Sequence, residues 1–287
     1  PPPSRSPVFP ADQELPPTPL VIFESAVLRA IKNFPPGSAS GIDGLLPQHL
    51  LDLVSISAGD SGKKLLTAIT NLCNFLVKGQ LKNTVCKKFF GASLLAFNKP
   101  NGGIRPIAIG TTFRPLVSKL ICQIIKSESG RIFRPQQLGF GTQMGCEKII
   151  HTVRSFIHSS LDSENILLKL DFKNAFNTIE RDIMLKSFQE KFPDLYPFVW
   201  QSYRYPMNLF YDSKLILSQT GCQQGDPLGP LLFSLCIQPL VQQLNSQLNL
   251  FYLDDGTLSG DPKIVLSDLQ EIIKYGSEIG IMLNPLN

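Results

Sequence analysis

The chain alternates between apolar residues at helical spacing and short apolar runs, so it predicts a mixture of helices and strands. Apolar residues three and four apart occur in five segments: Val21–Phe34, Pro47–Val54, Lys64–Leu76, Phe113–Ile125 and Glu147–His158. Apolar stretches that favour strands occur in three: Val85–Asn98, Ile166–Leu170 and Leu215–Thr220. This alternation indicates an α/β (α+β) fold in which helices pack against a sheet.

Two segments have the residues of tight β-hairpins. In Phe251–Leu258, apolar residues surround Asp254-Asp255-Gly256, and Asp-Gly turns need the positive φ angles that these residue types tolerate. In Asn98–Ala108, an Asn-Gly-Gly turn separates two apolar runs, with Lys99 and Arg105 on its shoulders. Both segments therefore predict charged side chains close to a hairpin turn.

Two helix starts are predicted from capping residues rather than from periodicity. Asn177 and Glu180, three residues apart, fit a capping box for a helix over Glu180–Lys191. Asp226-Pro227 fits an N-cap with proline at the first helical position, and apolar residues continue as far as Leu244. Each helix would follow a turn at the end of a predicted strand.

Composition narrows the class of protein only partly. The chain has 287 residues, 43% of them hydrophobic, which is enough for one large or two modest globular domains. Lys plus Arg number 27 against 23 for Asp plus Glu, so charge alone does not indicate nucleic-acid binding. The proline-rich residues 1–20 predict an extended or disordered leader. No run of 18 uncharged apolar residues is present for a membrane span.

The cysteine and histidine pattern disfavours a zinc site. The six cysteines include no Cys-x-x-Cys pair, and the chain has three histidines, so the spacing of zinc ligands is poor. An irregular cysteine pattern is also not typical of a disulfide scaffold. We therefore expect free thiols in a reducing compartment.

Three carboxylates occupy positions where a divalent metal site could form. Asp171 closes the apolar run Ile166–Leu170, and burying a carboxylate alone at the end of a core strand costs too much free energy. Asp254 and Asp255 repel each other at a hairpin tip, and hard cations such as Mg²⁺ prefer carboxylate oxygens. In one sheet, these carboxylates could hold two divalent ions about 4 Å apart, which suits nucleotidyl transfer. A solvated acidic turn is the alternative interpretation of Asp-Asp-Gly alone.

Three segments, in this order, resemble motifs A, B and C of reverse transcriptases: Leu170–Asn177 (LDFKNAFN), Gln224–Leu231 (QGDPLGPL) and Tyr252–Asp255 (YLDD). The turn Ser38–Gly44 and the following helix are similar to the N-terminal extension of non-long-terminal-repeat (LINE-type) retrotransposon enzymes. The resemblance implies right-hand polymerase fingers and palm, with an antiparallel palm sheet and no thumb in this chain. It divides the sequence into a leader (1–20), an N-terminal extension (21–60), and fingers and palm (61–287).

The resemblance also assigns roles to individual residues. The catalytic carboxylates would be Asp171, Asp254 and Asp255, which with the Phe172 carbonyl would bind two Mg²⁺ ions, or Mn²⁺ as an alternative. The residues expected to contact the incoming deoxynucleoside triphosphate are Lys99, Arg105, Asn174, Ala175, Phe176, Gln224 and Gly225. Those expected at the template and primer are Arg114, Lys119 and Tyr252, with surface charge as the alternative for the first two.

The chemistry of these residue types fits the roles. Lys99 and Arg105 could clamp a triphosphate, with the guanidinium as a bidentate donor. The Phe176 ring beside the sugar would leave no room for a 2′-hydroxyl and would select deoxynucleotides. Gly225 allows close backbone approach, and Gln224 offers both a donor and an acceptor. The alternatives are a solvated basic hairpin and a core phenylalanine.

The expected function is RNA-directed DNA synthesis by a retrotransposon enzyme, which adds deoxynucleotides to a primer 3′-hydroxyl on an RNA or DNA template. The expected location is intracellular and, by resemblance, nuclear. Two other interpretations remain open: a truncated or co-opted palm that binds nucleic acid without synthesis, and a group II intron-type enzyme. Phe176 and Tyr252 disfavour an RNA-dependent RNA polymerase. The resemblance continues through Gly280–Pro285, but Asn287 stands where relatives usually place a lysine.

Overall fold

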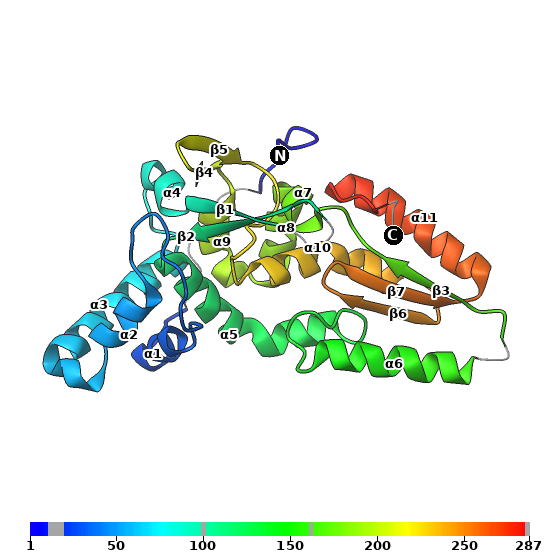
Figure 1. Ribbon diagram of the computed structural model, residues 1–287, viewed down its shortest axis with the longest axis horizontal. Coiled ribbons are helices and arrows are strands. Elements are labelled where there is room, and N and C mark those ends of the chain that lie inside the picture. The colour runs from blue at the N-terminus through cyan, green and yellow to red at the C-terminus, as the bar shows by residue number, and fades with distance from the viewer. Residues whose placement is uncertain (11–19, 99–101, 161–162, 285–287) are drawn as a thin grey trace.

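A computed structural model describes residues 1–10, 20–98, 102–160 and 163–284. Two β-sheets lie apart along an elongated molecule, with helices α1 to α3 at one end and the smaller sheet at the other (Figure 1). The helices are α1 (Glu24–Lys32), α2 (Pro47–Leu53), α3 (Gly59–Val77), α4 (Asn83–Phe89), α5 (Phe113–Phe133), α6 (Gly145–Ser159), α7 (Ala175–Thr178), α8 (Arg181–Lys191), α9 (Tyr196–Tyr203), α10 (Gly229–Gln243) and α11 (Pro262–Ile279). The five helices predicted from apolar spacing are confirmed as α1, α2, α3, α5 and α6.

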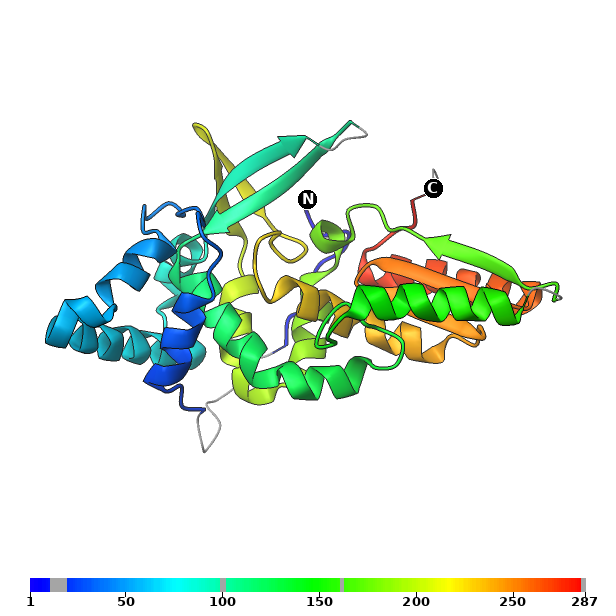
Figure 2. The ribbon, with the colours of Figure 1, turned by 60° about the horizontal axis from the view of Figure 1, so that its bottom comes forward.

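The larger sheet contains β1 (Ala92–Asn98), β2 (Ile104–Gly110), β4 (Met207–Tyr211) and β5 (Lys214–Ser218) in the order β2-β1-β4-β5. Strands β1 and β2 pair antiparallel from Ala92↔Gly110 to Asn98↔Ile104, which confirms the predicted hairpin. In Figure 2 this hairpin projects beyond the helical body on the side facing the smaller sheet. It therefore brings Arg105 toward the region between the two sheets.

The smaller sheet contains β3 (Ile166–Leu170), β6 (Leu248–Tyr252) and β7 (Asp255–Gly260), in the order β3-β7-β6 with every pair antiparallel. Helices α6 and α11 lie on opposite sides of it (Figures 1 and 2). Phe251 and Leu258 belong to the main core, whereas Leu248 and Leu250 pack against α6 in a second cluster. The antiparallel sheet with packed helices is as predicted.

The segment Val85–Asn98 is only partly a strand. Its first residues belong to helix α4, and the strand begins at Ala92. Cys86 and Phe90, four residues apart, are both fully buried, so this stretch packs with helical spacing. The helical spacing is hard to recognise in the sequence because it includes the apolar run Phe89-Phe90, and such short runs do not distinguish buried helices from strands.

Both helices predicted from capping residues are confirmed as α8 and α10, but their predicted capping residues are wrong. Helix α8 begins at Arg181 with Glu180 at the N-cap position, and Asn177 lies in the preceding helix α7. Helix α10 begins at Gly229, not at Asp226-Pro227. The Asp226 carboxylate accepts a hydrogen bond from the Leu228 backbone at 3.0 Å, but it also forms a buried ion pair with Arg114. The start of α10 thus lies two residues beyond the predicted proline, and the Asp226 carboxylate is shared between the backbone turn and Arg114.

The first ten residues are held against the body of the protein rather than disordered. The Arg5 guanidinium donates to both Asp182 carboxylate oxygens, at 2.7 and 3.0 Å. Ser4 donates to the Glu180 carboxylate, and the Trp200 indole donates to the Pro10 carbonyl. Residues 1–10 contain no helix or strand, which agrees with an extended leader, but these hydrogen bonds do not agree with disorder; residues 11–19 lie outside the described residues.

Two further sequence expectations concern helices and thiols. Among the described residues, no helix is both long and apolar enough to cross a membrane. All six cysteines are free thiols, and Cys146 is exposed.

Candidate active site

Asp171 stands at the point where the chain leaves the smaller sheet. The register of β3 on β7 ends at Leu170↔Gly256, so Asp171 lies one step further on, beside Asp255. Neighbouring antiparallel residues lie about 5 Å apart, and the sheet therefore brings the two predicted motifs together. Helix α7 begins directly after Asn174, which has a φ of 53°.

A C-terminal segment fixes the position of Asp171. The Asn284 side chain donates to an Asp171 carboxylate oxygen at 3.0 Å, and the Asn284 backbone N–H donates to the Asp171 carbonyl at 2.8 Å. Phe172 pairs with Leu283 in an isolated antiparallel bridge. The segment Gly280–Pro285 was matched to the family pattern, and its described part therefore holds the loop after β3. Pro285 and Asn287 lie outside the described residues.

Asp254 lies in a two-residue turn between β6 and β7. Tyr252 pairs with Asp255, so the turn residues are Leu253 and Asp254, and Leu253 has the positive φ of 57°. The hairpin is confirmed, but the positive φ expected at Asp-Gly is at Leu253 instead. Gly256 is required for packing, because a Cβ there would lie 2.7 Å from the Phe251 ring.

The electrostatic surroundings of Asp254 indicate converging negative charge. Burial raises the pKa of Asp254 above its ordinary value, and the charges of Asp255 and Asp171 raise it further. Backbone hydrogen bonding and the Arg105 guanidinium act in the opposite direction. The three predicted carboxylates are therefore close enough to repel one another, and Arg105 faces them from the other sheet.

The donor set suits a hard cation in its chemistry, because carboxylate oxygens are the ligands that Mg²⁺ prefers. A bound cation would also relieve the repulsion that raises the pKa of Asp254. Within the described residues, however, no three His, Cys, Asp or Glu side chains are grouped so that they could hold a metal ion together. Asp171 and Asp254 are the candidate ligands, and a ready-made three-carboxylate cage is not present among these residues.

A cleft of about 560 Å³ brings five of the predicted residues together: Arg105, Phe176, Gln224, Gly225 and Asp254. They come from β2, α7, the loop before α10 and the β6–β7 turn, so both sheets contribute. Asn174 lines an adjacent hollow of about 390 Å³, which Gln224 also lines. Ala175 is buried at the start of α7, and Lys99 lies outside the described residues.

Phe176 forms one wall of this cleft. Its ring stacks on the buried Phe233 ring of α10, with ring centroids 4.7 Å apart and planes inclined by 19°. Stacking on a core residue limits the movement of the ring. The half-buried position leaves part of Phe176 facing the cleft, as a residue that contacts a ligand requires.

The Gln224-Gly225 pair is held by strand β2. The Ala108 N–H donates to the Gln224 carbonyl at 2.9 Å. Gly225 has a φ of 114°, and a Cβ there would lie 2.8 Å from the Ala108 carbonyl oxygen. The glycine is therefore needed for the contact between the loop and β2, which fixes the floor of the cleft.

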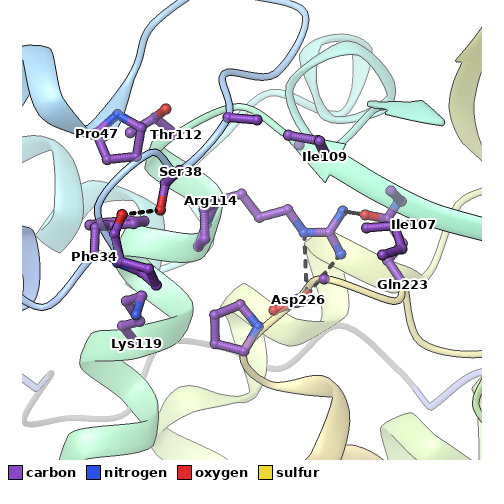
Figure 3. Close-up of a pocket in the computed structure, with 17 residues that line it drawn as sticks. Phe34, Ser38, Pro47, Ile107, Ile109, Thr112, Arg114, Lys119, Gln223 and Asp226 are labelled. Atoms are coloured by element: carbon purple, nitrogen blue, oxygen red, sulfur yellow. Dashed lines mark hydrogen bonds and ion pairs between the residues drawn. The ribbon is translucent and has the colours of Figure 1, made fainter. Parts of the chain in front are cut away.

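Arg114 does not contact template or primer, contrary to the prediction. Its side chain is 2% exposed and forms an ion pair with Asp226 at 3.0 Å. The guanidinium also donates to the Phe90 carbonyl at 2.7 Å and to Gln223. Figure 3 shows a separate pocket of about 280 Å³, in which the Arg114 side chain points to Asp226 and Gln223. Buried cations need such partners, so Arg114 is a structural residue that joins α5 to the loop before α10.

The other two predicted template contacts differ from each other. Lys119 donates to the Asn33 carbonyl at 3.2 Å, and its ammonium lies 4.9 Å from the centre of the Phe34 ring. These contacts give Lys119 a role in packing α5 against the end of α1. Tyr252 is 37% exposed beside the carboxylate turn, so its contact with nucleic acid stays a prediction.

Sequence reasoning missed two buried residues around the site. Arg181 donates to the backbone carbonyls of Ser218 and Gly221, at 2.8 and 3.0 Å, and so holds the loop that leads to the Gln-Gly pair. Gln137 binds the backbone of Leu253 next to Asp254. No pattern in a single sequence pairs the segment that contains Gln137 with the turn at Leu253, which lies 116 residues further along the chain.

Two sheets that place an arginine, an aromatic ring, a Gln-Gly loop and an aspartate turn around one cleft define a polymerase of the palm-and-fingers class. The sequence matches the family reverse transcriptase (RNA-dependent DNA polymerase) over residues 97–286. The chain therefore belongs to the reverse transcriptase family, as its three motifs predicted.

Two relatives are 24% identical to this chain. One is the retrotransposable element SLACS 132 kDa protein of Trypanosoma brucei gambiense, matched over 261 residues, 86% of this chain and 21% of that protein. The other is the putative COX1/OXI3 intron 1 protein of Saccharomyces cerevisiae, matched over 166 residues, 57% of this chain and 19% of that protein. The chain thus spans about a fifth of the length of these relatives.

Solved structures of telomerases share the fold. Telomerase from Candida albicans, in complex with a TWJ fragment of telomeric RNA, superposes with a TM-score of 0.53 at 11% identity, covering 71% of this chain and 43% of that chain. Apo telomerase from Candida tropicalis, truncated from its C-terminal domain, gives 0.51 at 13% identity, covering 69% and 49%. At this identity the likeness concerns the fold alone, and it confirms the mixed α/β fingers and palm.

Proposed function

We propose that this chain is the fingers and palm of an RNA-directed DNA polymerase from a retrotransposon, which adds deoxynucleotides to a primer 3′-hydroxyl. The observation that carries the proposal is the cleft lined jointly by Arg105, Phe176, Gln224 and Asp254. The arginine provides a cation for a triphosphate, and the phenylalanine provides a flat ring for a sugar. The glutamine provides an amide for a base pair, and the aspartate provides a carboxylate for a metal-assisted transfer.

Asp171 and Asp254, with the Phe172 carbonyl and help from Asp255, would hold divalent Mg²⁺ or Mn²⁺. Bound there, two such ions would favour deprotonation of the primer 3′-hydroxyl and stabilise the charge on the departing pyrophosphate. Burial and then the charges of Asp255 and Asp171 raise the pKa of Asp254, and this repulsion between carboxylates supports cation binding at this position. Asn284 would keep the Asp171 carboxylate oriented toward the turn through its hydrogen bond.

The nucleotide would lie between the two sheets. Arg105 on β2 would donate to its phosphates, and Phe176 would lie against its sugar and exclude a 2′-hydroxyl. Gln224 would contact the newly formed base pair, because its carboxamide has both donors and an acceptor. In this account the sequence of the product is set by base pairing, and the protein supplies position and charge.

The names of the similar proteins support a nucleic-acid substrate. The SLACS protein is named as a retrotransposable element, and the Candida albicans telomerase was solved with RNA. We infer that this chain accepts an RNA or DNA template with a paired primer, and that it works inside the nucleus. Contacts to the phosphate backbone would make its binding salt-dependent.

Primer extension tests the proposal. With an RNA template, a DNA primer, deoxynucleotides and Mg²⁺, we expect extension by the unaltered chain and a rate at least about a hundredfold lower in Asp254→Asn, since one metal ligand is lost. Asp60→Asn is the matched control, because Asp60 is exposed on α3 and pairs only with Lys63 in the described ion pairs. Equal extension rates in Asp254→Asn and Asp60→Asn would contradict the assignment of Asp254 as a metal ligand.

A second function, nucleic-acid binding without synthesis, is favoured by one observation. The three carboxylates do not form a group that could hold a metal ion among the described residues. A chain that binds a template–primer duplex in gel-shift assays, but gives no extension at any Mg²⁺ or Mn²⁺ concentration, would have this second function. Any divalent-ion-dependent product that Asp254→Asn abolishes would exclude it.

A further inference from the structure

The turn that holds Asp254 is conformationally unfavourable by itself. Leu253 has a φ of 57°, a left-handed conformation that is unfavourable for a residue with a side chain and that glycine adopts freely. Such conformations persist only where neighbouring groups determine them. Contacts from outside the hairpin are therefore expected to hold Leu253.

Those contacts come from the segment between α5 and α6. The Gln137 side-chain N–H donates to the Leu253 carbonyl at 3.0 Å, and the Leu253 N–H donates to the Gln137 side-chain oxygen at 2.8 Å. The same oxygen accepts from the Gly139 N–H at 3.0 Å. The carboxamide thus binds both polar groups of Leu253 and one of its own loop.

The surrounding backbone makes this arrangement rigid. Leu138 donates to the Phe251 carbonyl and Phe251 donates to the Gln136 carbonyl, both at 2.8 Å. Gln137 itself is 0% exposed. Gly139 packs so closely that a Cβ there would lie 2.5 Å from the Leu253 nitrogen. The backbone of residues 136–139 therefore supports the tip of the β6–β7 hairpin.

We propose that Gln137 is a positioning residue that holds Leu253 in its left-handed conformation and thereby aims the Asp254 carboxylate into the nucleotide cleft. Gln137 touches no substrate in this account and acts only through the backbone next to Asp254. Its importance for catalysis rests on the proposed polymerase function, whereas its hold on the turn does not.

Amide hydrogen exchange of the whole chain tests the hold without any activity. In Gln137→Met, which keeps the length of the side chain but removes both hydrogen bonds to Leu253, we expect the peptide covering 250–256 to exchange at least about tenfold faster. Gln201→Met is the matched control, because Gln201 is also buried, at 5% exposed, and donates to the Leu81 carbonyl, away from the turn. Unchanged exchange in Gln137→Met, with circular dichroism showing a folded chain, would overturn the proposal.

Primer extension then tests the positioning. Because displacement of a catalytic group by about 1 Å can cost a hundredfold, Gln137→Met should lower kcat by about that factor. The Kd for the template–primer duplex should be unchanged, and half-maximal rate should need more Mg²⁺. Adding Leu253→Gly to Gln137→Met should restore part of kcat, since glycine needs no help to adopt this φ.

The outcomes separate the two claims. Faster exchange in Gln137→Met together with wild-type kcat would overturn the positioning role. Absence of restoration by Leu253→Gly would also contradict it, because the conformation of Leu253 would then not be the cause. If the unaltered chain gave no extension while exchange still rose, the polymerase function would fail and the hold of Gln137 on the turn would stand.

Discussion

At the scale of single residues, Phe176 is the side chain on which the choice of sugar depends. Its half-buried ring is fixed by stacking on Phe233, so it cannot move aside for a bulkier sugar without losing that contact. We expect Phe176→Ala to incorporate ribonucleotides at least about tenfold more efficiently relative to deoxynucleotides. Competition between the two nucleotides in primer extension measures this ratio.

Phe210→Ala is the control for this substitution, because Phe210 is a partly exposed ring on β4 that does not line the nucleotide cleft. It should leave the ratio of ribonucleotide to deoxynucleotide incorporation unchanged. Unaltered discrimination by Phe176→Ala would remove its proposed role.

The raised pKa of Asp254 predicts how the stability of the folded chain depends on pH. Its pKa is raised in the folded chain by burial and by Asp255 and Asp171. An acid with a raised folded pKa favours folding where it is protonated, and it opposes folding at higher pH where it is charged. Asp254→Asn should therefore raise the thermal unfolding midpoint at pH 7, without divalent ions, by about 1 °C or more.

This gain should shrink as pH falls through the raised pKa of Asp254 and should vanish below the unfolded value near 3.9, because Asp254 is then protonated in both states. Thermal unfolding at pH 7 and at about pH 3 measures the difference. The exposed Asp60→Asn should give no gain at either pH. A gain for Asp254→Asn that is equal at both pH values would contradict the electrostatic account.

At the scale of elements, the two hairpins show what local sequence determines. Asn98–Ala108 and Phe251–Leu258 were both recognised, because turn residues between apolar runs are a local signal. The exact turn in the second was wrong. Leu253, not Asp-Gly, adopts the positive φ, and the distant Gln137 side chain binds both polar backbone groups of Leu253. Local patterns thus located the element, whereas a tertiary contact set the position of its turn.

The Gln-Gly loop yields a prediction at the same scale. Gly225 combines a φ of 114° with a β2 carbonyl 2.8 Å from where its Cβ would lie. Gly225→Ala should therefore lower the free energy of unfolding by about 1–3 kcal/mol and widen the contact with β2. Urea unfolding measures this change. Gly229→Ala is the control, since its Cβ would meet no atom closer than 3.7 Å, and equal stability of the two variants would refute the packing account.

At the scale of the whole molecule, the sequence predicted the class of fold and five of the twelve residues that line the cleft. The resemblance to the family assigned Arg105, Phe176, Gln224 and Asp254 to the site, and all four line the same cleft. The buried cations were not recognised. Arg114 looked like a phosphate ligand, yet its partner Asp226 lies 112 residues away, and such pairing has no local signal.

Arg114 and Arg181 together show how the cleft is kept in shape. Arg114 joins α5 to Asp226, and Arg181 joins α8 to the backbone before Gly225. Tyr203 lies against both guanidinium groups, at 5.1 and 5.4 Å from its ring centre. Burial and the nearby positive charge of Arg114 lower the pKa of Arg181 to about 10, with Tyr203 acting in the opposite direction. Two cations are thus buried behind the site, where they hold loops rather than substrates.

Asp171 and Asp254 are expected to share one divalent ion. A crystal structure of this chain with template, primer and Mn²⁺, located by anomalous scattering, tests it most directly. The account predicts an ion with oxygens of both carboxylates about 2.1 Å away, close to the value for Mg²⁺. Manganese bound elsewhere, or the two carboxylates more than about 8 Å apart, too far for one ion to bridge, would contradict the account.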